Sequence, residues 1–334
     1  VSSHSGERRH RNLRTVFSSS WNLLTSGERR CFSTLWVFRS PFSTCAAAGI
    51  TGSSPEVLGA LCSKSLVENS LNGRYELHPL LREYSRNMFN GDYGILEDRH
   101  SEYFCGELSS MVQEINTSSS SEYMETISRS YPDFIAGVKR ALDKGMDLPL
   151  KGAMKALRIY FLRRGLFLDG SEIFRKAVDL MRSRKDPLCH EFMVDLGSFL
   201  GKLQRYDQAI PFMEKAGLSG DDLVRSRANY ESGVIYMRTG NLERAEEKML
   251  KALEYARTAG DPGTEASALA GLGDTYNHLH KPEKAEYFMK QAIGISRRNG
   301  NLMTLFSCLV TLSNIMYNGG RYEEALSYAV KALE

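Results

Sequence analysis

The residue whose position is most suggestive of chemistry is His78, within the segment from Arg74 to Tyr84. Residues 74–77 alternate as in a short strand, and Pro79 fits the first turn of the helix that follows. His78 is therefore expected at a strand-to-helix junction, beside the free N–H groups of a helix start. A histidine there can contact an anion such as a phosphate. The alternative is a structural histidine without a ligand, because a short motif alone does not separate the two.

No set of residues has the spacing of a familiar catalytic motif. A P-loop needs Gly-x-x-x-x-Gly-Lys-Ser/Thr, so that backbone amides and a lysine surround the phosphates of a nucleotide. Gly201-Lys202 is followed by Leu203 and has Leu196 where the first glycine should stand. His-Glu-x-x-His and Gly-x-Ser-x-Gly motifs are also absent. We therefore predict no catalytic residue and no cofactor in this chain. ADP or ATP would need a separate nucleotide-binding domain.

The cysteines show no paired spacing. They lie far apart, at Cys31, Cys45, Cys62, Cys105, Cys189 and Cys308. This pattern argues against a metal site and against a disulfide framework. Because most of them fall within apolar helical patterns, they are predicted to be buried thiols.

Length and composition suit a soluble protein of more than one domain. The chain has 334 residues, of which 42% are hydrophobic and 25% charged. No run approaches the roughly 18 consecutive apolar residues that span a bilayer, so we expect a cytoplasmic protein without membrane contact. The chain begins at Val1 and ends at Glu334 directly after a helix-pair repeat, so we expect it to be a fragment.

The charge is uneven along the chain. Residues 1–90 hold 11 Lys and Arg against 6 Asp and Glu, an excess of five, while the whole chain carries a net charge of +3. This bias is compatible with a nucleic-acid partner but is too small to predict one.

The N-terminal part predicts helices followed by a β-hairpin. Residues 1–11 are rich in Ser, His and Arg and are expected to be disordered. Apolar spacing over residues 13–24 indicates a helix, and the capping box at 25–28 opens a second one that reaches Phe38. A short alanine-rich helix is expected at about 43–48.

A further helix is expected to begin after Ser54, and two strand-like runs follow it. These runs, 65–68 and 74–77, flank Asn72-Gly73, a strong hairpin signal. Helices followed by such a hairpin form a winged helix.

The segments Asn12–Trp21, Glu28–Arg39, Leu61–Val67 and Tyr75–Tyr84 resemble the winged-helix domain of bacterial STAND regulators, which are NB-ARC-type ATPases joined to tetratricopeptide repeats. In that family the histidine of a Met-His-Asp motif contacts the β-phosphate of ADP and helps to hold the resting state. Leu77-His78-Pro79 matches this motif at the histidine. The resemblance therefore implies a nucleotide-sensing role for His78 and a neighbouring nucleotide-binding domain as an intramolecular partner.

Alanines recur at tetratricopeptide spacing in the second half of the chain. Ala209, Ala245, Ala285 and Ala325 follow one another at intervals of 36, 40 and 40, and another alanine stands seven residues after each. A small residue precedes each of them by twelve positions: Gly197, Gly233, Gly273 and Ser313. Small residues let the two helices of a pair approach closely, so the pattern predicts a solenoid of helix pairs.

The helical period also selects a groove-facing side of the solenoid. If Gly233 and Tyr236 pack inside their helix pair, polar and aromatic residues line the groove. The selected residues are Arg227, Tyr230, Val234, Met237, Arg238, Asp274, Asn277, His278, Asn314, Tyr317 and Asn318. Such a mixture suits a protein or peptide segment, or a small inducer, although these residues could also merely solvate the surface.

The sequence therefore predicts a mainly α-helical protein. Its expected parts are a disordered tail (1–11), a winged helix (12–92), a helical connector (93–150) with a serine-rich loop at 118–121, and a tetratricopeptide-repeat α-solenoid (151–334). The expected function is regulatory: the winged helix controls a neighbouring nucleotide-binding domain while the solenoid senses a protein or inducer.

The main alternative is a transcription factor whose winged helix binds DNA directly. Its third helix, at about 54–63, offers only Glu56 and Ser63 for contacts with bases, and Lys64 lies just past its end. We therefore expect DNA binding to be weak. The identity of the solenoid ligand does not follow from the fold.

Overall fold

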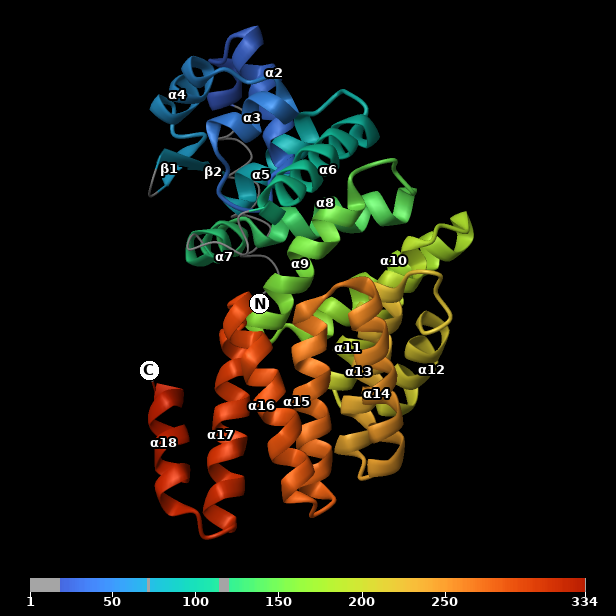
Figure 1. Cartoon of the computed structure of the whole chain (residues 1–334). Helices are drawn as coiled ribbons and strands as arrows, with labels where there is room; N and C mark the ends of the chain where they lie inside the picture. The colour runs from blue at the N-terminus through green and yellow to red at the C-terminus, as the bar shows by residue number, and fades with distance from the viewer. Residues whose placement is uncertain (1–18, 71–72, 114–119, 334) are drawn as a thin grey trace, which may run out of the picture. The chain divides into compact units, whose positions relative to one another are not determined.

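The computed structural model describes residues 19–70, 73–113 and 120–333 (Figure 1). It is mainly α-helical, as predicted, with a single small sheet among the described residues. The chain divides into two compact units between Arg164 and Gly165, and each unit is described separately below. The finer ranges expected from the sequence, 12–92, 93–150 and 151–334, stay predictions.

The first unit contains the predicted capping box. Helix α2 (Ser26–Thr34) begins after Thr25, whose hydroxyl oxygen accepts the N–H of Glu28 at 3.3 Å. The Glu28 carboxylate in turn accepts the N–H of Thr25 at 2.7 Å and the ammonium of Lys64 at 2.6 Å. Because Lys64 caps the end of α4 (Pro55–Ser63), this carboxylate joins the two helices.

The second predicted helix is shorter than expected. After α2 the chain forms the short 3-10 helix η1 (Leu35–Val37), and Phe38 is extended. The prediction of a helix reaching Phe38 was therefore wrong at its end. All residues from Leu35 to Phe38 are buried, so this run has no exposed side whose period could mark the end of the helix. The alanine-rich helix α3 (Thr44–Thr51) follows, three residues longer than expected at its C-terminus.

The hairpin is present but begins later than predicted. Strands β1 (Glu68–Ser70) and β2 (Arg74–Glu76) pair antiparallel, with Asn69 opposite Tyr75. Ser65 has φ +56°, so the chain turns there and the two residues before β1 pack as a buried loop. Phe42 adds a bridge to Tyr75, with two backbone hydrogen bonds of 2.8 Å.

Five more helices complete the first unit. They are α5 (Pro79–Met88), α6 (Tyr93–Ser110), α7 (Ser120–Arg129), α8 (Tyr131–Lys144) and α9 (Leu150–Arg164), with the 3-10 turn η3 (Met111–Gln113) after α6. Part of the serine run expected as a loop lies outside the described residues, and its last two residues, 120 and 121, begin α7. Helices α6 and α8 pack against each other, and α6 also contacts α3 and α9.

One buried carboxylate joins three segments of this unit. Asp133 of α8 accepts hydrogen bonds from the N–H groups of Arg39 (2.8 Å) and Ser40 (2.9 Å). It also contacts the hydroxyl of Ser40 and lies 2.8 Å from Nε2 of His100 on α6. Asp133 and His100 are both buried, so these contacts set the position of the segment that follows η1.

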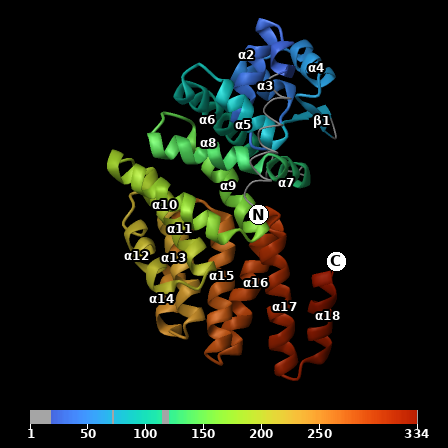
Figure 2. The same cartoon turned by 180° about the vertical axis from the view of Figure 1, so that it is seen from behind.

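The second unit consists of antiparallel helices in sequence order. Both views show α13 to α18 placed side by side along the unit (Figures 1 and 2). Each helix packs on the one before it, as in a solenoid. The bounds are α10 (Phe167–Arg184), α11 (Leu188–Lys202), α12 (Tyr206–Ala216), α13 (Asp222–Arg238), α14 (Leu242–Ala259), α15 (Pro262–His278), α16 (Pro282–Asn299), α17 (Leu302–Asn318) and α18 (Tyr322–Leu333).

The predicted repeat register is confirmed by the packing. The alanines that recur at 209, 245, 285 and 325 are all buried. In three of the four pairs, a methionine of the second helix fills the space over the glycine of the first, at Gly197, Gly233 and Gly273. A Cβ added to Gly197 would come within 2.6 Å of Met213, and one added to Gly273 within 2.7 Å of Met289. These glycines therefore set the distance between the paired helices.

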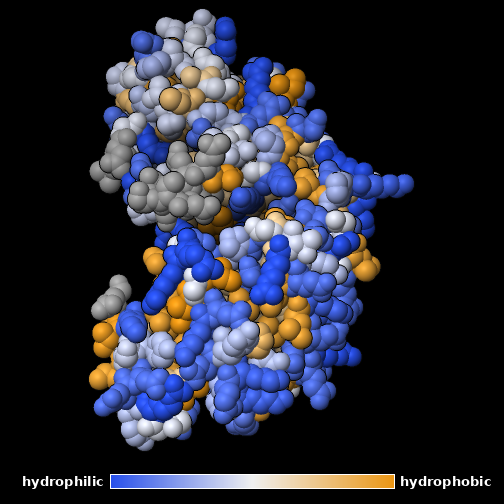
Figure 3. Space-filling model, in the orientation of Figure 1, coloured by the Kyte–Doolittle hydropathy of each residue, from blue (hydrophilic) through white to orange (hydrophobic). Residues whose placement is uncertain are grey.

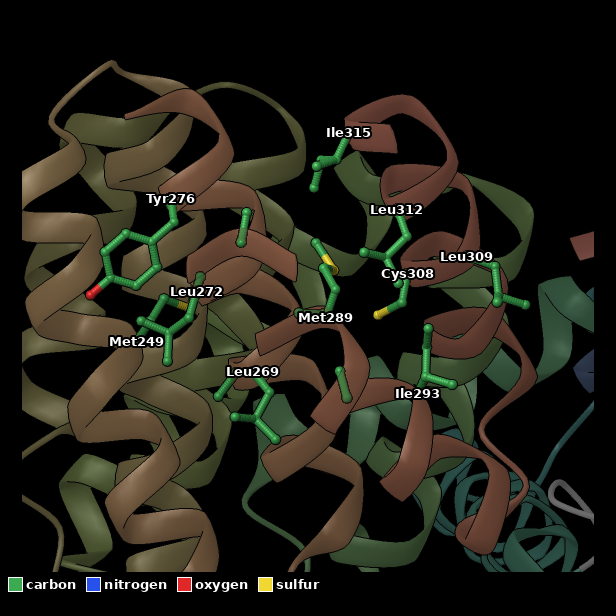
Figure 4. Close-up of a cluster of buried hydrophobic side chains, with 14 of the residues drawn as sticks. Met249, Leu269, Leu272, Tyr276, Met289, Ile293, Cys308, Leu309, Leu312 and Ile315 are labelled. Atoms are coloured by element: carbon green, nitrogen blue, oxygen red, sulfur yellow. The ribbon is translucent and has the colours of Figure 1, made fainter. Parts of the chain in front are cut away.

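The core of the last repeats is continuous. Met249, Leu272 and Met289 belong to one buried cluster that extends to Leu312 and Ile315 of α17 (Figure 4). At the last helix pair this burial weakens, and apolar side chains reach the surface (Figure 3). These are Leu302, Met303, Phe306, Val310, Tyr322, Leu326, Val330 and Leu333.

The thiols follow the prediction with one exception. Cys31, Cys105, Cys189 and Cys308 are buried and Cys62 is half-buried, but Cys45 is exposed. Burial raises the pKa of Cys105 and of Cys308 to about 12, so neither is a reactive nucleophile at neutral pH. Within the described ranges, no group of three or more His, Cys, Asp and Glu residues could hold a metal ion, and no helix could cross a bilayer.

Candidate functional site

The residues selected from the sequence lie on the first helices of successive pairs. Together with α11, the helices α13, α15 and α17 form a row in which each contacts the next. We call the side chains along this row the partner face. It is built on helices rather than loops, and the helix pairs behind it fix its spacing.

Polar contacts cross from α11 to α13 on the partner face. Arg227 donates from Nη2 to the carboxylate of Asp195 at 2.5 Å. One helical turn further along, the hydroxyl of Ser198 donates to Glu231 at 3.1 Å. Arg227 is therefore already engaged in an ion pair and is only half-buried, so it can present part of its surface to a ligand.

Two further contacts continue the row. The hydroxyl of Thr275 on α15 lies 3.9 Å from the sulfur of Met237 on α13. On the next helix, the hydroxyl of Thr311 donates to the carboxylate of Asp274 at 3.3 Å. Four helices are thus joined by side-chain contacts on one face.

Burial changes the acid-base properties of the partner face. Burial raises the pKa of Glu231 above its ordinary value of 4.5, while Lys202, the Ser198 hydroxyl and Arg227 act in the opposite direction. Burial also raises the pKa of Asp274, against the effects of Thr311 and the nearby His278. In both residues burial therefore favours the protonated carboxyl over the carboxylate.

The residues selected from the sequence differ in their exposure to solvent. Arg238, His278, Asn314, Tyr317 and Asn318 are exposed. Arg227, Tyr230, Val234, Met237, Asp274 and Asn277 are half-buried.

Two aromatic residues among them already have neighbours. The ring of Tyr230 packs against the buried cluster, which limits what it can offer a partner. Tyr317 meets Tyr322 edge-on, with 5.5 Å between the ring centroids, at the turn between α17 and α18. Tyr317 therefore lies at the end of the row, beside that turn.

Sequence reasoning missed the residues that hold the face together. Asp195 and Ser198 belong to α11, and Thr311 belongs to α17. The same repeat offsets applied one repeat earlier would have selected Ser198, which stands 36 residues before Val234, but not Asp195, because its counterpart Glu231 was not selected either. Glu231 itself lies four residues after Arg227 and so shares its side of α13.

His78 lies where the sequence predicted. It is exposed between β2 and α5, and its Nδ1 accepts the N–H of Leu80 at 3.3 Å, so its side chain caps the helix. An accepting nitrogen carries no proton, so this bond requires the neutral tautomer with its proton on Nε2. The ring is therefore oriented with Nε2 as a donor that a ligand could use.

Tetratricopeptide repeat families match the chain over residues 190–216 and 225–298. These ranges hold all of α12, α14 and α15 and most of α11, α13 and α16. These parts of the second unit are therefore tetratricopeptide repeats, a fold that is typically non-catalytic.

The chain is 24% identical over 329 residues to the regulatory protein AfsR of Streptomyces griseus. The aligned region covers 95% of this chain and 32% of that protein. The chain thus spans about a third of the length of this relative. Among solved structures it is similar to a Signal Transduction ATPase with Numerous Domains (STAND) protein with a tetratricopeptide repeat sensor from Pyrococcus horikoshii. That match has a TM-score of 0.52 at 21% identity and covers 95% of this chain and 52% of the other. At this identity the likeness concerns the fold.

Proposed function

We propose that this chain is the sensing and control part of a STAND-type signalling regulator. In this proposal the tetratricopeptide repeats bind a protein segment, a peptide or a small inducer, and the first unit transmits that event to a nucleotide-binding domain. The observation that carries the proposal is the partner face, on which side chains from four helices contact one another in a row.

The partner face suits recognition of a polar segment rather than an apolar cofactor. Its exposed members include a guanidinium, an imidazole and an amide, from Arg238, His278 and Asn314. Half-buried carboxylates at Glu231 and Asp274 lie among them. Each carboxylate accepts one side-chain hydrogen bond, and a ligand with amides or a positively charged group could supply further ones, which an aliphatic ligand could not.

The control role assigned to the first unit rests on the resemblance to STAND regulators and on the geometry of His78. The helices α2 and α4 with the hairpin β1–β2 are compatible with a winged helix. We propose that Nε2 of His78 donates to a phosphate of ADP bound in the neighbouring domain. One such charge-assisted bond contributes about 1.5–3 kcal/mol, which is too little to hold a nucleotide but enough to bias a switch.

The partner face can be tested in a regulator that contains this chain and responds to an inducing signal. Replacing Arg238, His278 and Asn314 by Ala should abolish the response while leaving helical content intact, since a few anchors carry most interface energy. A matched triple replacement on α14, at Glu243, Lys251 and Glu254, removes three exposed polar side chains outside the face. An unchanged response in the first variant, or an equal loss in both, would contradict the proposal.

Direct DNA binding is less well supported. Helix α4 would have to enter the major groove, yet it carries no arginine or lysine, and its first turn holds Glu56. We expect binding to duplex DNA to be weak, with a shallow dependence on salt. Tight, sequence-selective binding in a mobility-shift assay at physiological salt would favour the alternative.

A further inference from the structure

A positively charged cavity lies in the first unit, apart from the partner face. Its volume is about 410 Å³, within the range of about 300–1,000 Å³ that is usual for small-molecule sites. The wall includes Trp36, Arg39, Arg82, Glu83, Arg86 and Glu97. These residues come from η1, the segment after it, α5 and α6, so the cavity is formed by the tertiary packing of this unit.

The guanidinium groups of Arg39 and Arg82 are without hydrogen-bond or ion-pair partners among the described residues. Burial lowers the pKa of Arg39, and the charges of Arg82 and Arg86 act in the same direction, against Asp133 and Glu97. The three arginines are thus close enough to repel one another. The carboxylate of Asp133 is already engaged by the backbone N–H groups at positions 39 and 40.

The other charged residues of the wall, Arg86, Glu83 and Glu97, do not neutralise the positive charge of Arg39 and Arg82. Arg86 lies over the ring of Trp36, 5.1 Å from its centroid, and 5.9 Å from that of Tyr93. Glu97 is hydrogen-bonded to Arg140, which does not line the cavity. Glu83 is therefore the one wall carboxylate that is not engaged in this way, against three wall arginines.

Trp36, the aromatic residue of the wall, has a hydrogen-bond donor without a partner. Trp36 is only 7% exposed, and its indole Nε1–H has no hydrogen-bond partner within the described residues. A buried donor without a partner is uncommon in folded proteins. The cavity wall thus combines guanidinium donors that have no protein partner with the aromatic ring of Trp36.

We propose that this cavity binds a small molecule that carries a phosphate monoester. Two neighbouring guanidinium groups without carboxylate partners match a dianion, and a phosphate monoester carries about −1.5 to −2 charges at neutral pH, whereas a carboxylate carries one. Guanidinium donors bind phosphate oxygens in pairs, and the stacked Trp36 and Arg86 provide a flat wall for the rest of the ligand.

This site is separate from the histidine site. His78 is not among the residues that line the cavity, although its neighbour Pro79 is. The inference therefore does not depend on a neighbouring nucleotide-binding domain and can be tested on this chain as it stands.

Calorimetric titration with phenyl phosphate and with benzoate tests the proposal, because the two probes share a ring and differ in the anion. We expect saturable one-to-one binding of phenyl phosphate, about tenfold or more tighter than that of benzoate. Arg39→Gln and Arg82→Gln should each weaken binding by about tenfold or more. Arg30→Gln removes the same charge from an exposed position on α2 and should change the affinity by no more than about twofold.

Several outcomes would overturn the proposal. One is the absence of saturable phenyl phosphate binding at millimolar concentration, and another is equal affinity for benzoate. An equal loss in Arg30→Gln would show diffuse attraction instead of a site. Loss of binding in His78→Ala would assign the phosphate to the histidine site. The guanidinium of Arg82 makes no hydrogen bond that folding requires, so Arg82→Gln keeps the test valid if Arg39→Gln fails to fold.

Discussion

Met249 of α14 packs directly against the backbone of Gly233 on α13. A Cβ added to Gly233 would lie 3.0 Å from the sulfur and the terminal methyl group of Met249, tighter than most real Cβ contacts. The methionine stands four residues after Ala245, the alanine that marks the repeat. The same arrangement joins Gly197 to Met213, so one packing rule repeats along the solenoid.

Enlarging the repeat alanine should therefore destabilise the solenoid. Ala245 has no exposed surface, and Leu at this position should force the α13–α14 pair apart at a cost of about 1–3 kcal/mol. Urea unfolding followed by circular dichroism measures this loss. Ala259→Leu makes the same change at an exposed position on the same helix and should be nearly neutral. A neutral effect at Ala245 would mean that the repeat register is wrong.

Removing the carboxylate of Asp133 should strongly destabilise the first unit. Asp133→Ala leaves the N–H groups of Arg39 and Ser40 and the ring of His100 without their shared acceptor. Breaking a buried network of this kind costs about 3–5 kcal/mol. Asp147→Ala, at an exposed position between α8 and α9, serves as the control in chemical denaturation. Equal stability of the two variants would show that the network is not structurally important.

The stability of the solenoid should depend on the protonation of Glu231. Burial raises its pKa in the folded state above the ordinary 4.5, so the folded state holds the proton more tightly than the unfolded chain. Stability from this group is complete below pH 4.5 and decreases as pH rises through the raised folded pKa.

Glu231→Gln removes this titration. The variant should be more stable than the parent chain at neutral pH, and the difference should shrink toward pH 4.5. The free energy of unfolding at a series of pH values measures this, with Glu243→Gln at an exposed position as the control. A difference that grows as the pH is lowered would have the wrong sign and would refute the interpretation.

The cap and ligand roles of His78 can be separated by two substitutions. His78→Ala removes both the cap at Leu80 and the donor at Nε2, and should cost about 0.5–2 kcal/mol of stability. His78→Asn keeps a good N-cap and removes the imidazole, so it should leave stability nearly unchanged.

In a protein that joins this chain to a nucleotide-binding domain, both variants should release ADP faster if Nε2 contacts a phosphate. A bond of the expected strength corresponds to a shift of about 10- to 150-fold. Release measured with a fluorescent ADP analogue tests this. Faster release in the Ala variant alone would assign the effect to the cap, and unchanged release in both would return His78 to a structural role. The isolated chain should bind no ADP through His78.

The sequence by itself determined the repeat architecture and several local features. Spacing of 36 to 40 residues between alanines predicted the helix pairs, because packing within a pair requires small residues at set positions. The capping box at Glu28 and the junction at His78 were also predicted, since both depend on residues close in sequence. The end of α2 and the start of β1 were not, because the buried run after α2 and the buried run before β1 carry no period.

Only the tertiary structure decided which charges meet. Arg39 and Arg82 lie 43 positions apart, and neither belongs to a motif, yet they line one cavity. The same holds for Asp195, whose role on the partner face depends on Arg227 from the next repeat. Helical periodicity reports which side of a helix is buried, but the neighbour on that side is set by how distant helices pack. The sequence alone therefore does not predict the arginine-lined cavity or the contacts of the partner face.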